Sequence, residues 1–335
     1  MLAVSFLFCI FVYGTPFETE AVVKEIPSSE GNPDYGTFST ENGFSFTTKL
    51  ADDDMVFGLG EANRGINKRG FLYISDCADD PNHVESKTSL YAAHNFIIIS
   101  GKTHVGFFFD YPGTLRFDIG YTTSDTMTVS CENADLYVYM ITGDSDLDIV
   151  KQFRGIIGRS YIAPKFAFGY GQSRWGYKTE DDFRTVVKKY RENHVPLDMV
   201  YMDIDYMQDY KDFTVNEERF PDFEGFVQDM KKEKIHLVPI IDAGVKVEEG
   251  YDIYEEGCEK GYFCRREDGS YFEATVWPGW THFPDVLNAD ARKWFGDKYD
   301  VLVSKGIDAF WNDMNEPSIF YSQEGLADFK ETAKK

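Results

Sequence analysis

The chain has 335 residues, of which 43% are hydrophobic and 27% are charged, and its formal net charge is −23. This length is sufficient for two domains, each with a core of its own. The negative charge is spread along the chain in short acidic runs. It excludes nucleic acid and acidic membrane surfaces as partners, because binding to phosphate requires positive charge. A neutral ligand is unaffected by this charge.

The cysteines show neither the spacing of a disulfide framework nor that of a zinc site, and they are Cys9, Cys77, Cys131, Cys258 and Cys264. We therefore expect reduced thiols, no bound metal and a cytoplasmic location. Residues 1–14 contain an apolar run that is too short to span a bilayer and lacks the basic start of a signal peptide. We expect this segment to lie outside the fold, with an export signal as the less favoured alternative.

Residues 15–146 are expected to form the first domain. Aromatic and β-branched runs alternate there with turn residues such as Gly101, Pro112-Gly113 and Gly143-Asp144. Short strands at this spacing are typical of an antiparallel β-sandwich. The predicted strands are Phe44–Thr48, Phe96–Ser100, Val105–Asp110, Met127–Cys131 and Leu136–Ile141.

After Ser145 the hydrophobic period becomes that of a helix, and residues 147–166 are expected to form a linking helix and connector. Residues 167–335 then alternate between strands and helices, which implies a parallel sheet covered by helices. Without a GxGxxG turn, this order favours a (β/α)8 TIM barrel over a dinucleotide-binding fold. Only the first four βα units are present, so the predicted barrel is incomplete. Its expected strands are 167–174, 198–205, 235–242 and 307–313.

Helices are expected between these strands. Thr179 can cap the first helix, whose initial turn is acidic and whose last turns are basic, as the helix dipole favours. The second helix presents an apolar face that includes Phe223 and Phe226, and the third follows Asn288. The sequence therefore predicts one helix after each of the first three strands.

Acidic and aromatic residues end the predicted barrel strands. The active site of a (β/α)8 barrel lies at the carboxyl ends of its strands, so these residues should meet at one mouth. Alternation along a strand places Asp203 with Asp205, and Trp311 with Asp313, while Asp242 ends the third strand. Carboxylates suit glycoside hydrolysis, because they stabilise or capture an oxocarbenium-like transition state. They also accept hydrogen bonds from sugar hydroxyls.

These acidic residues also allow interpretations other than catalysis. An Asp at the end of a strand is more often a turn or helix cap than a catalyst. The Asp203-x-Asp205 pair could bind a divalent cation, but such sites usually gather more oxygen ligands, so no metal is predicted. A phosphatase-like loop is contradicted by Tyr206-Met207. Asp205 is expected to be a structural partner of Asp203.

Four segments carry a resemblance to a known family: Gly58–Gly70 (GLGEANRGINKRG), Gly171–Tyr177 (GQSRWGY), Met202–Asn216 (MDIDYMQDYKDFTVN) and Phe310–Phe320 (FWNDMNEPSIF). In this order they resemble glycoside hydrolase family 31, the α-glucosidase and α-xylosidase family. The similarity is greatest to bacterial cytosolic-type α-glucosidases and runs from about residue 12 to the end. It implies that the first domain is galactose-mutarotase-like.

The resemblance implies a retaining exo-α-glycosidase that needs no cofactor, because carboxyl groups perform the proton and covalent steps. Asp313 matches the position of the nucleophile. The substrate-binding positions that match are Asp203 in the −1 subsite, Asp242 at its floor, Trp277 and Trp311 along its walls, Asp76 toward the next subsite and Trp175 at the rim. The expected partner is an oligosaccharide, and a homo-oligomer is left open.

The general acid of this family is an Asp on a later barrel strand, with Arg and His partners, whereas this sequence ends at Lys335. We therefore expect the isolated chain to lack the acid, to be inactive, and to be poorly soluble because its strand edges are exposed. The predicted activity of the parent protein is hydrolysis of α-linked gluco-oligosaccharides. The alternatives are a catalytically inert carbohydrate-binding fragment and an α-xylosidase, and the choice between α-1,4 and α-1,6 linkages stays open.

Overall fold

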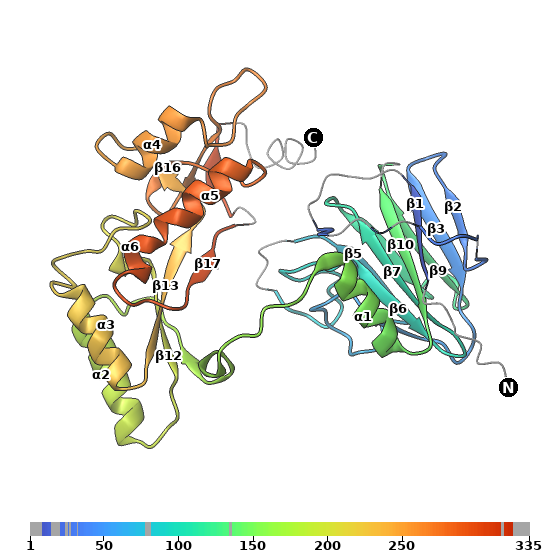
Figure 1. The fold of residues 1–335 in the computed structure, drawn as a ribbon, viewed down its shortest axis with the longest axis horizontal. Coiled ribbons are helices and arrows are strands. Elements are labelled where there is room, and N and C mark those ends of the chain that lie inside the picture. Colours follow the sequence, from blue (N-terminus) through green and yellow to red (C-terminus); the bar gives the residue numbers. More distant parts are fainter. Residues whose placement is uncertain are drawn as a thin grey trace. The chain divides into compact units, whose positions relative to one another are not determined.

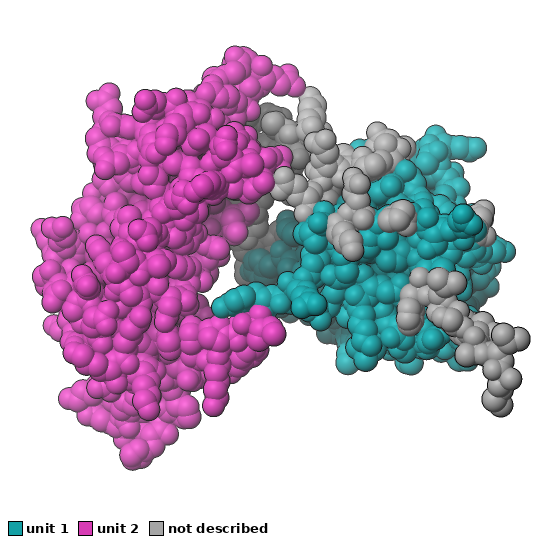
Figure 2. Space-filling model, viewed as in Figure 1, with its two compact units in different colours: residues 1–161 teal, residues 162–335 magenta. Residues whose placement is uncertain are grey.

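The chain forms two compact units, residues 1–161 and residues 162–335 (Figures 1 and 2). The division falls within the connector expected over 147–166. Helix α1 (Asp146–Ile157) belongs to the first unit, so the expected linking helix is part of the first domain. The computed structural model describes residues 9–14, 21–23, 26, 28–31, 33–77, 82–133, 136–315 and 318–323.

The first unit is the predicted antiparallel sandwich, made of two five-stranded sheets. One sheet has the order β1-β10-β7-β6-β4, formed by Ile10–Gly14, Tyr137–Gly143, His104–Asp110, Phe96–Ser100 and Met55–Gly58. The other has the order β2-β3-β9-β8-β5, formed by Thr37–Ser39, Phe44–Lys49, Thr126–Cys131, Leu115–Ile119 and Phe71–Ser75. All five strands predicted from the sequence are present, within two residues at each end.

The core of the sandwich follows from alternation along its strands. In β3, Phe44 and Phe46 are buried while the residues between and after them are less so. The rings of Phe46 and Phe107 lie with their centroids 4.8 Å apart, which joins the two sheets. Sheets that bury one face against each other show this hydrophobic alternation.

Strands β6 and β7 depart from alternation because helix α1 covers their outer face. Ile98 and Phe108 point away from the sandwich core and form a second cluster with residues of α1. Phe96 stacks on Phe153 of α1, with centroids 3.9 Å apart and planes 2° from parallel. A strand covered on both faces is hydrophobic throughout, which explains the run FIIIS in β6.

Residues 10–14 correct the expectation that the first 14 residues lie outside the fold. They form β1, which pairs antiparallel with β10 over its whole length. Phe11 is 8% exposed and packs in the core of the sandwich. The apolar composition of this segment therefore reflects burial at a sheet edge, while residues 1–8 lie outside the described part of the chain.

The second unit contains the four predicted parallel strands, in the order β11-β12-β13-β17. They are Gly171–Gln172, Met199–Met202, His236–Asp242 and Trp311–Asp313. The pairing is parallel throughout, as expected for one half of a (β/α)8 barrel. β13 lies within one residue of its predicted range, whereas β11, β12 and β17 are shorter than the predicted strands.

Helices α2 (Glu180–Glu192) and α3 (Phe223–Lys232) run side by side in Figure 1 and share a core through Phe183 and Phe226, whose rings lie 6.0 Å apart. Thr179 caps α2 as predicted, in a reciprocal capping box with Asp182. Further α-helices among the described residues of this unit are α4 (Asp252–Lys260), α5 (Ala289–Lys298) and α6 (Asp300–Val303). In the described part of the chain, no helix combines the length and apolar character that a membrane span requires.

A small antiparallel sheet was not predicted. It has the order β14-β16-β15-β18, formed by Val245–Lys246, Gly279–His282, Glu273–Val276 and Tyr321–Ser322. Strand β14 begins three residues after the end of β13, and β18 follows the end of β17 by eight residues. The sheet therefore grows out of the same ends of the parallel strands at which the candidate site lies. Strands of two to four residues are too short to show a period in the sequence.

We expect Phe11→Ala to destabilise the first unit by about 3 kcal/mol, because it removes a buried ring from the sandwich core. The measurement is urea unfolding of the chain followed by circular dichroism. Ile66→Ala is the control, since Ile66 is 78% exposed and its truncation should change the unfolding free energy by less than about 0.5 kcal/mol. Equal effects of the two variants would contradict the assignment of β1 to the core.

Candidate active site

The pairing of β13 with β17 places Asp242 directly beside Asp313, at the carboxyl ends of adjacent parallel strands. On the other side of β13, Met202 pairs with Pro239, so Asp203 leaves β12 at the same end of the sheet. The structure therefore brings together the three carboxyl groups that the sequence placed at the ends of strands two, three and four. Asp203 and Asp313 are partly buried, whereas Asp242 is 2% exposed.

Burial and mutual repulsion raise the pKa values of two of these carboxyls. Burial is the main cause for Asp242, and the charges of Asp313 and Asp203 add to it, so that its pKa rises to about 7. Burial also raises the pKa of Asp203, with smaller contributions from Asp205 and Asp313. In the described structure neither carboxyl oxygen of Asp242 has a hydrogen-bond partner. A ligand with hydroxyl donors would supply what this buried group lacks.

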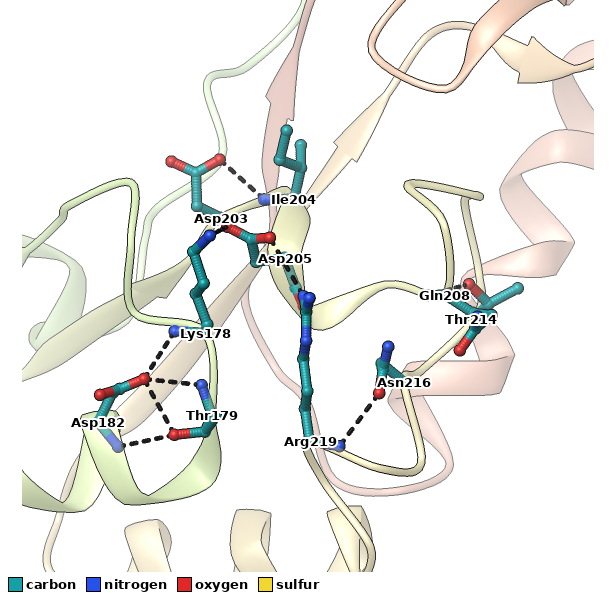
Figure 3. A network of polar contacts seen from close by, with 10 residues as sticks. All are labelled: Lys178, Thr179, Asp182, Asp203, Ile204, Asp205, Gln208, Thr214, Asn216 and Arg219. Atoms are coloured by element: carbon teal, nitrogen blue, oxygen red, sulfur yellow. Dashed lines mark hydrogen bonds and ion pairs between the residues drawn. The ribbon is translucent and has the colours of Figure 1, made fainter.

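Asp203 and Asp205 do not share one face of a strand, which corrects the sequence analysis. Strand β12 ends at Met202, and the chain turns at once into the 3₁₀ helix η2 (Ile204–Tyr206). Asp203 is the N-cap of this turn, and its Oδ1 accepts a hydrogen bond from the Ile204 amide at 2.7 Å. The 3₁₀ turn sends the two carboxyls in different directions (Figure 3).

Asp205 is held by two cationic side chains (Figure 3). Arg219 donates to its Oδ1 at 3.1 Å and to its main-chain oxygen at 2.7 Å, while the Lys178 Nζ lies 3.7 Å from its Oδ2. Asp205 is 1% exposed, so these contacts neutralise a buried charge. This arrangement fits the structural role expected for Asp205 and argues against a cation bound between Asp203 and Asp205.

The predicted aromatic residues of the site form a cluster at the small sheet. Trp277 occupies the two-residue turn between β15 and β16, and its ring stacks on that of Trp175 at 6.4 Å. Phe320, which the sequence analysis did not single out, contacts Trp277 edge to face at 4.9 Å. Trp277 is 46% exposed and Trp175 is 61% exposed. Exposed, mutually supported rings can stack on sugar rings.

Trp311 and Met314 lie on either side of the end of the fourth parallel strand, β17. Trp311 is partly buried and contacts Tyr201 of β12 edge to face at 6.0 Å. Met314 adopts a left-handed conformation with φ of 60°, and its side chain is buried against Phe272 and other members of a small cluster. Non-glycine residues rarely adopt this conformation, so it is kept here by packing. The strained turn fixes the direction in which the chain leaves Asp313.

Asp76 belongs to the first unit, where it follows β5 and is exposed. The Ser89 hydroxyl donates to its main-chain oxygen. Residues 78–81 of the same segment lie outside the described part of the chain. The expected reach of Asp76 toward a second sugar subsite stays a prediction.

Asp212, which was not predicted from the sequence, is fully buried next to the main chain of Asp242. Its Oδ1 accepts a hydrogen bond from the main-chain amide of Asp242 at 3.1 Å. Burial, followed by the nearby charge of Asp242, raises the pKa of Asp212 well above its usual value. Asp212 lies in a polar segment that predicts a surface loop, so no signal in the sequence pointed to its burial.

Two family models match the chain. The glycosyl hydrolases family 31 TIM-barrel domain matches residues 160–335, and the glycosyl hydrolase 31 N-terminal galactose mutarotase-like domain matches residues 17–118. These matches correspond to the barrel half and to the sandwich of the structure. The three barrel segments that carry the resemblance, Gly171–Tyr177, Met202–Asn216 and Phe310–Phe320, lie within the first match.

Curated relatives include α-glucosidases. The chain is 37% identical to Alpha-glucosidase 2 of Bacillus thermoamyloliquefaciens over 81% of its own length and 35% of the relative. It is 28% identical to an α-glucosidase of Saccharolobus solfataricus, over 92% of the chain and 45% of the relative. Glucoamylase 1 of Candida albicans is 33% identical over 88% of the chain and 32% of the relative. The chain thus spans between 32% and 45% of the length of these relatives.

Solved structures share the fold of both units. A family 31 dextranase of Flavobacterium johnsoniae, complexed with isomaltotriose, superposes with a TM-score of 0.77 at 23% identity, over 87% of this chain and 36% of the dextranase. A family 31 α-glucosidase from Bacteroides thetaiotaomicron gives a TM-score of 0.73 at 26% identity, over 84% of this chain and 48% of that protein. The first likeness supports the fold alone.

We expect Arg219→Met to lower the unfolding free energy of the second unit by about 2–4 kcal/mol, because it leaves the buried carboxyl of Asp205 without its hydrogen-bonded cation. Lys178→Met is the matched control. Lys178 is half exposed and contacts Asp205 at 3.7 Å without a hydrogen bond, so its loss should cost less than about 1 kcal/mol. Urea unfolding of both variants measures the difference. A larger effect from Lys178→Met than from Arg219→Met would contradict this ranking.

We expect Asp242→Asn to stabilise the second unit at alkaline pH. The folded protein raises the pKa of Asp242 from 3.8 to about 7, so the wild type loses stability as the pH rises between these values. The variant does not ionise at this position. The unfolding free energy of the variant should equal that of the wild type near pH 4 and exceed it increasingly up to about pH 7. Above that pH the difference should stay constant, on the order of 1–4 kcal/mol. Thermal unfolding between pH 4 and 9 measures it, and a variant that is less stable at pH 8 would contradict the expectation.

Proposed function

Because the chain belongs to glycosyl hydrolase family 31, we propose that the protein carrying this sequence is a retaining exo-α-glycosidase, specifically an α-glucosidase acting on α-linked gluco-oligosaccharides. The observation that carries the proposal is the meeting of Asp203, Asp242 and Asp313 at the carboxyl ends of three adjacent parallel strands. An oxocarbenium-like transition state needs negative charge around it, and this end of the sheet concentrates such charge.

Asp313 is the proposed nucleophile. Its carboxylate attacks the anomeric carbon from the face opposite to the leaving oxygen and forms a β-linked glycosyl-enzyme. The departing oxygen takes a proton from a general acid, and water then releases the sugar with its α configuration restored. The strained turn at Met314 supports this role, since it fixes the main chain next to the attacking group.

Asp203 and Asp242 are proposed to bind the sugar in the −1 subsite. The carboxyl of Asp203 is partly exposed and can accept hydrogen bonds from sugar hydroxyls. The raised pKa of Asp242 is a property of general acids, but a side chain that is 2% exposed lies under the sugar and cannot reach its leaving group. We therefore assign Asp242 to the floor of the subsite and assign the general acid to neither residue.

Trp311 and Trp277 are proposed to form walls of the −1 subsite, with Trp175, which stacks on Trp277, at its rim. The relatives named α-glucosidases support glucose as the preferred unit. Asp76 is proposed to contact the next sugar. No disulfide joins the five cysteines in the described structure, as expected for the reducing environment of the cytoplasm, the location we propose.

The test is hydrolysis of 4-nitrophenyl α-glucoside by the protein that carries this sequence. We expect Asp313→Asn to lower kcat by about 10³-fold or more, because an amide cannot form the covalent intermediate. Asp308→Asn is the control: it makes the same chemical change five residues earlier, where the carboxyl pairs with His236 on the surface, and should keep kcat within about threefold.

The product and the choice of substrate decide between the remaining possibilities. Proton NMR should show α-glucose as the first product, as retention requires. Normal activity of Asp313→Asn would overturn the assignment of the nucleophile. Faster hydrolysis of the α-xyloside than of the α-glucoside would identify an α-xylosidase, and sugar binding without turnover would identify a carbohydrate-binding protein.

A further inference from the structure

We propose that Asp212 is a positioning residue that stays uncharged in the folded protein: its carboxylic acid holds the main chain of Asp242 in place without adding a further negative charge beneath the site. The role in sugar binding rests on the function proposed above. The protonation and the positioning rest on the structure of the second unit alone.

Asp212 is 0% exposed, and among the described residues only one of its two carboxyl oxygens accepts a hydrogen bond. Oδ1 accepts the Asp242 amide at 3.1 Å, and Oδ2 has no hydrogen-bond partner in the described structure. The main-chain oxygen accepts the Tyr251 hydroxyl at 2.8 Å. A carboxylate at such a depth would be a buried charge without a paired cation, and burying a charge costs more free energy than burying the neutral carboxylic acid.

Among the residues that the structure describes, no cation neutralises Asp212. The groups that face it are Asp242 of β13, Tyr206 of η2, Tyr251 at the start of α4 and Tyr299 between α5 and α6. The cation next to it in the chain, Lys211, turns instead to Glu248, with Nζ 2.6 Å from Oε1. The environment thus consists of one acid and three phenols, which favours the neutral form of Asp212.

The loop that delivers Asp212 is strained, which indicates that this burial is specified by packing. Asp209, Tyr210 and Phe213 all have left-handed conformations with φ between 52° and 60°. Phe213 is itself buried, and the Thr214 hydroxyl ties the loop together by accepting the Gln208 amide at 2.9 Å. Backbone conformations of this kind persist only where surrounding contacts hold them.

The charge state of Asp212 affects the ionisation of Asp242. This carboxyl already lies beside Asp313 and Asp203, whose charges oppose its own. A negative charge on Asp212 would oppose it further and keep it protonated at neutral pH. An uncharged Asp212 anchors the end of β13 and leaves Asp242 able to ionise and accept hydrogen bonds from a sugar.

The first experiment follows protonated carboxyl groups in the 335-residue chain by infrared spectroscopy between pH 5 and 9. We expect the wild type to retain a protonated-carboxyl absorption at pH 8.5 that is lost in Asp212→Asn and kept in Asp242→Asn. The pH-dependent absorption change that is missing from the Asp242→Asn spectra is assigned to the titration of Asp242. Asp212→Asn should leave the midpoint of that titration within about half a pKa unit, because it replaces one neutral group by another.

A charged Asp212 predicts different results in the same spectra. The absorption at pH 8.5 would be missing from the wild type, and Asp212→Asn would lower the midpoint of Asp242 by about 1–3 pKa units. Either result overturns the claim that Asp212 is uncharged. Asp212→Asn is nearly isosteric and keeps the oxygen that accepts the Asp242 amide, so this comparison does not depend on a disruptive variant.

The second experiment tests positioning through hydrogen exchange of the Asp242 amide. Asp212→Leu removes its acceptor and should accelerate exchange at this amide at least about tenfold, while Asp212→Asn should preserve the wild-type rate. Equal exchange in Asp212→Leu and the wild type would overturn the positioning role. If Asp212→Leu does not fold, Asp212→Ala allows the same comparison in the same assay. Loss of protection of the Asp242 amide in Asp212→Asn would by itself overturn the positioning role, because this variant keeps the accepting oxygen.

The link to function is tested last, with 4-nitrophenyl α-glucoside. Asp212→Asn should keep KM within about twofold, whereas Asp212→Leu should raise KM more than it lowers kcat, because it disturbs a residue that binds the sugar. A lower kcat with unchanged KM in Asp212→Leu would overturn the sugar-binding part. If the wild type does not act on the glucoside, the proposed function fails, while the spectra and the exchange rates still decide the state and the role of Asp212.

Discussion

The parallel pairing of β13 with β17 is the interaction on which the candidate site depends. It sets Asp242 beside Asp313 at one end of the sheet, with Asp203 following on the other side of β13. Like charges this close are unfavourable, so the arrangement persists only because the strands are fixed by buried apolar contacts on their helix-covered side. Burial raises the pKa values of Asp203 and Asp242, and the repulsion between the carboxyls adds to this effect. A fold that concentrates unfavourable charge at one point is typical of a binding or catalytic site.

The carboxyls of this region are separated into different roles by their surroundings. Asp205 is ion-paired to Arg219 and Lys178, and therefore supports the turn that follows β12. Asp212 is enclosed by phenols and by Asp242, and therefore stays uncharged under our proposal. Asp203 is only partly buried and lies at the carboxyl end of the parallel sheet. The four carboxyls of this region thus differ in charge, exposure and partners, although they are chemically identical. They belong to Asp203, Asp205, Asp212 and Asp242.

The small antiparallel sheet adds the aromatic part of the site. Because β14 and β18 leave the ends of β13 and β17, the hairpin of β15 and β16 is held near those ends and presents Trp277 at its turn. Trp175 and Phe320 support the indole ring from two directions. The sheet converts the ends of the parallel strands from an acidic surface into one that also offers apolar faces, and sugars require both kinds of contact.

The sequence by itself determined the two-domain order, the five main strands of the sandwich, the four parallel strands and the acidic residues that end them. These features depend on local periodicity and on the rule that parallel strands present their carboxyl ends together. The tertiary structure decided what periodicity cannot express. Residues 10–14 are a strand because β10 offers them an edge, and Asp203 and Asp205 diverge because the chain turns after Met202. Asp212 is buried because a strained loop folds it under Asp242, a contact between residues that are 30 positions apart. Burial and charge pairing arise from such distant contacts, so they are fixed only when the chain is folded.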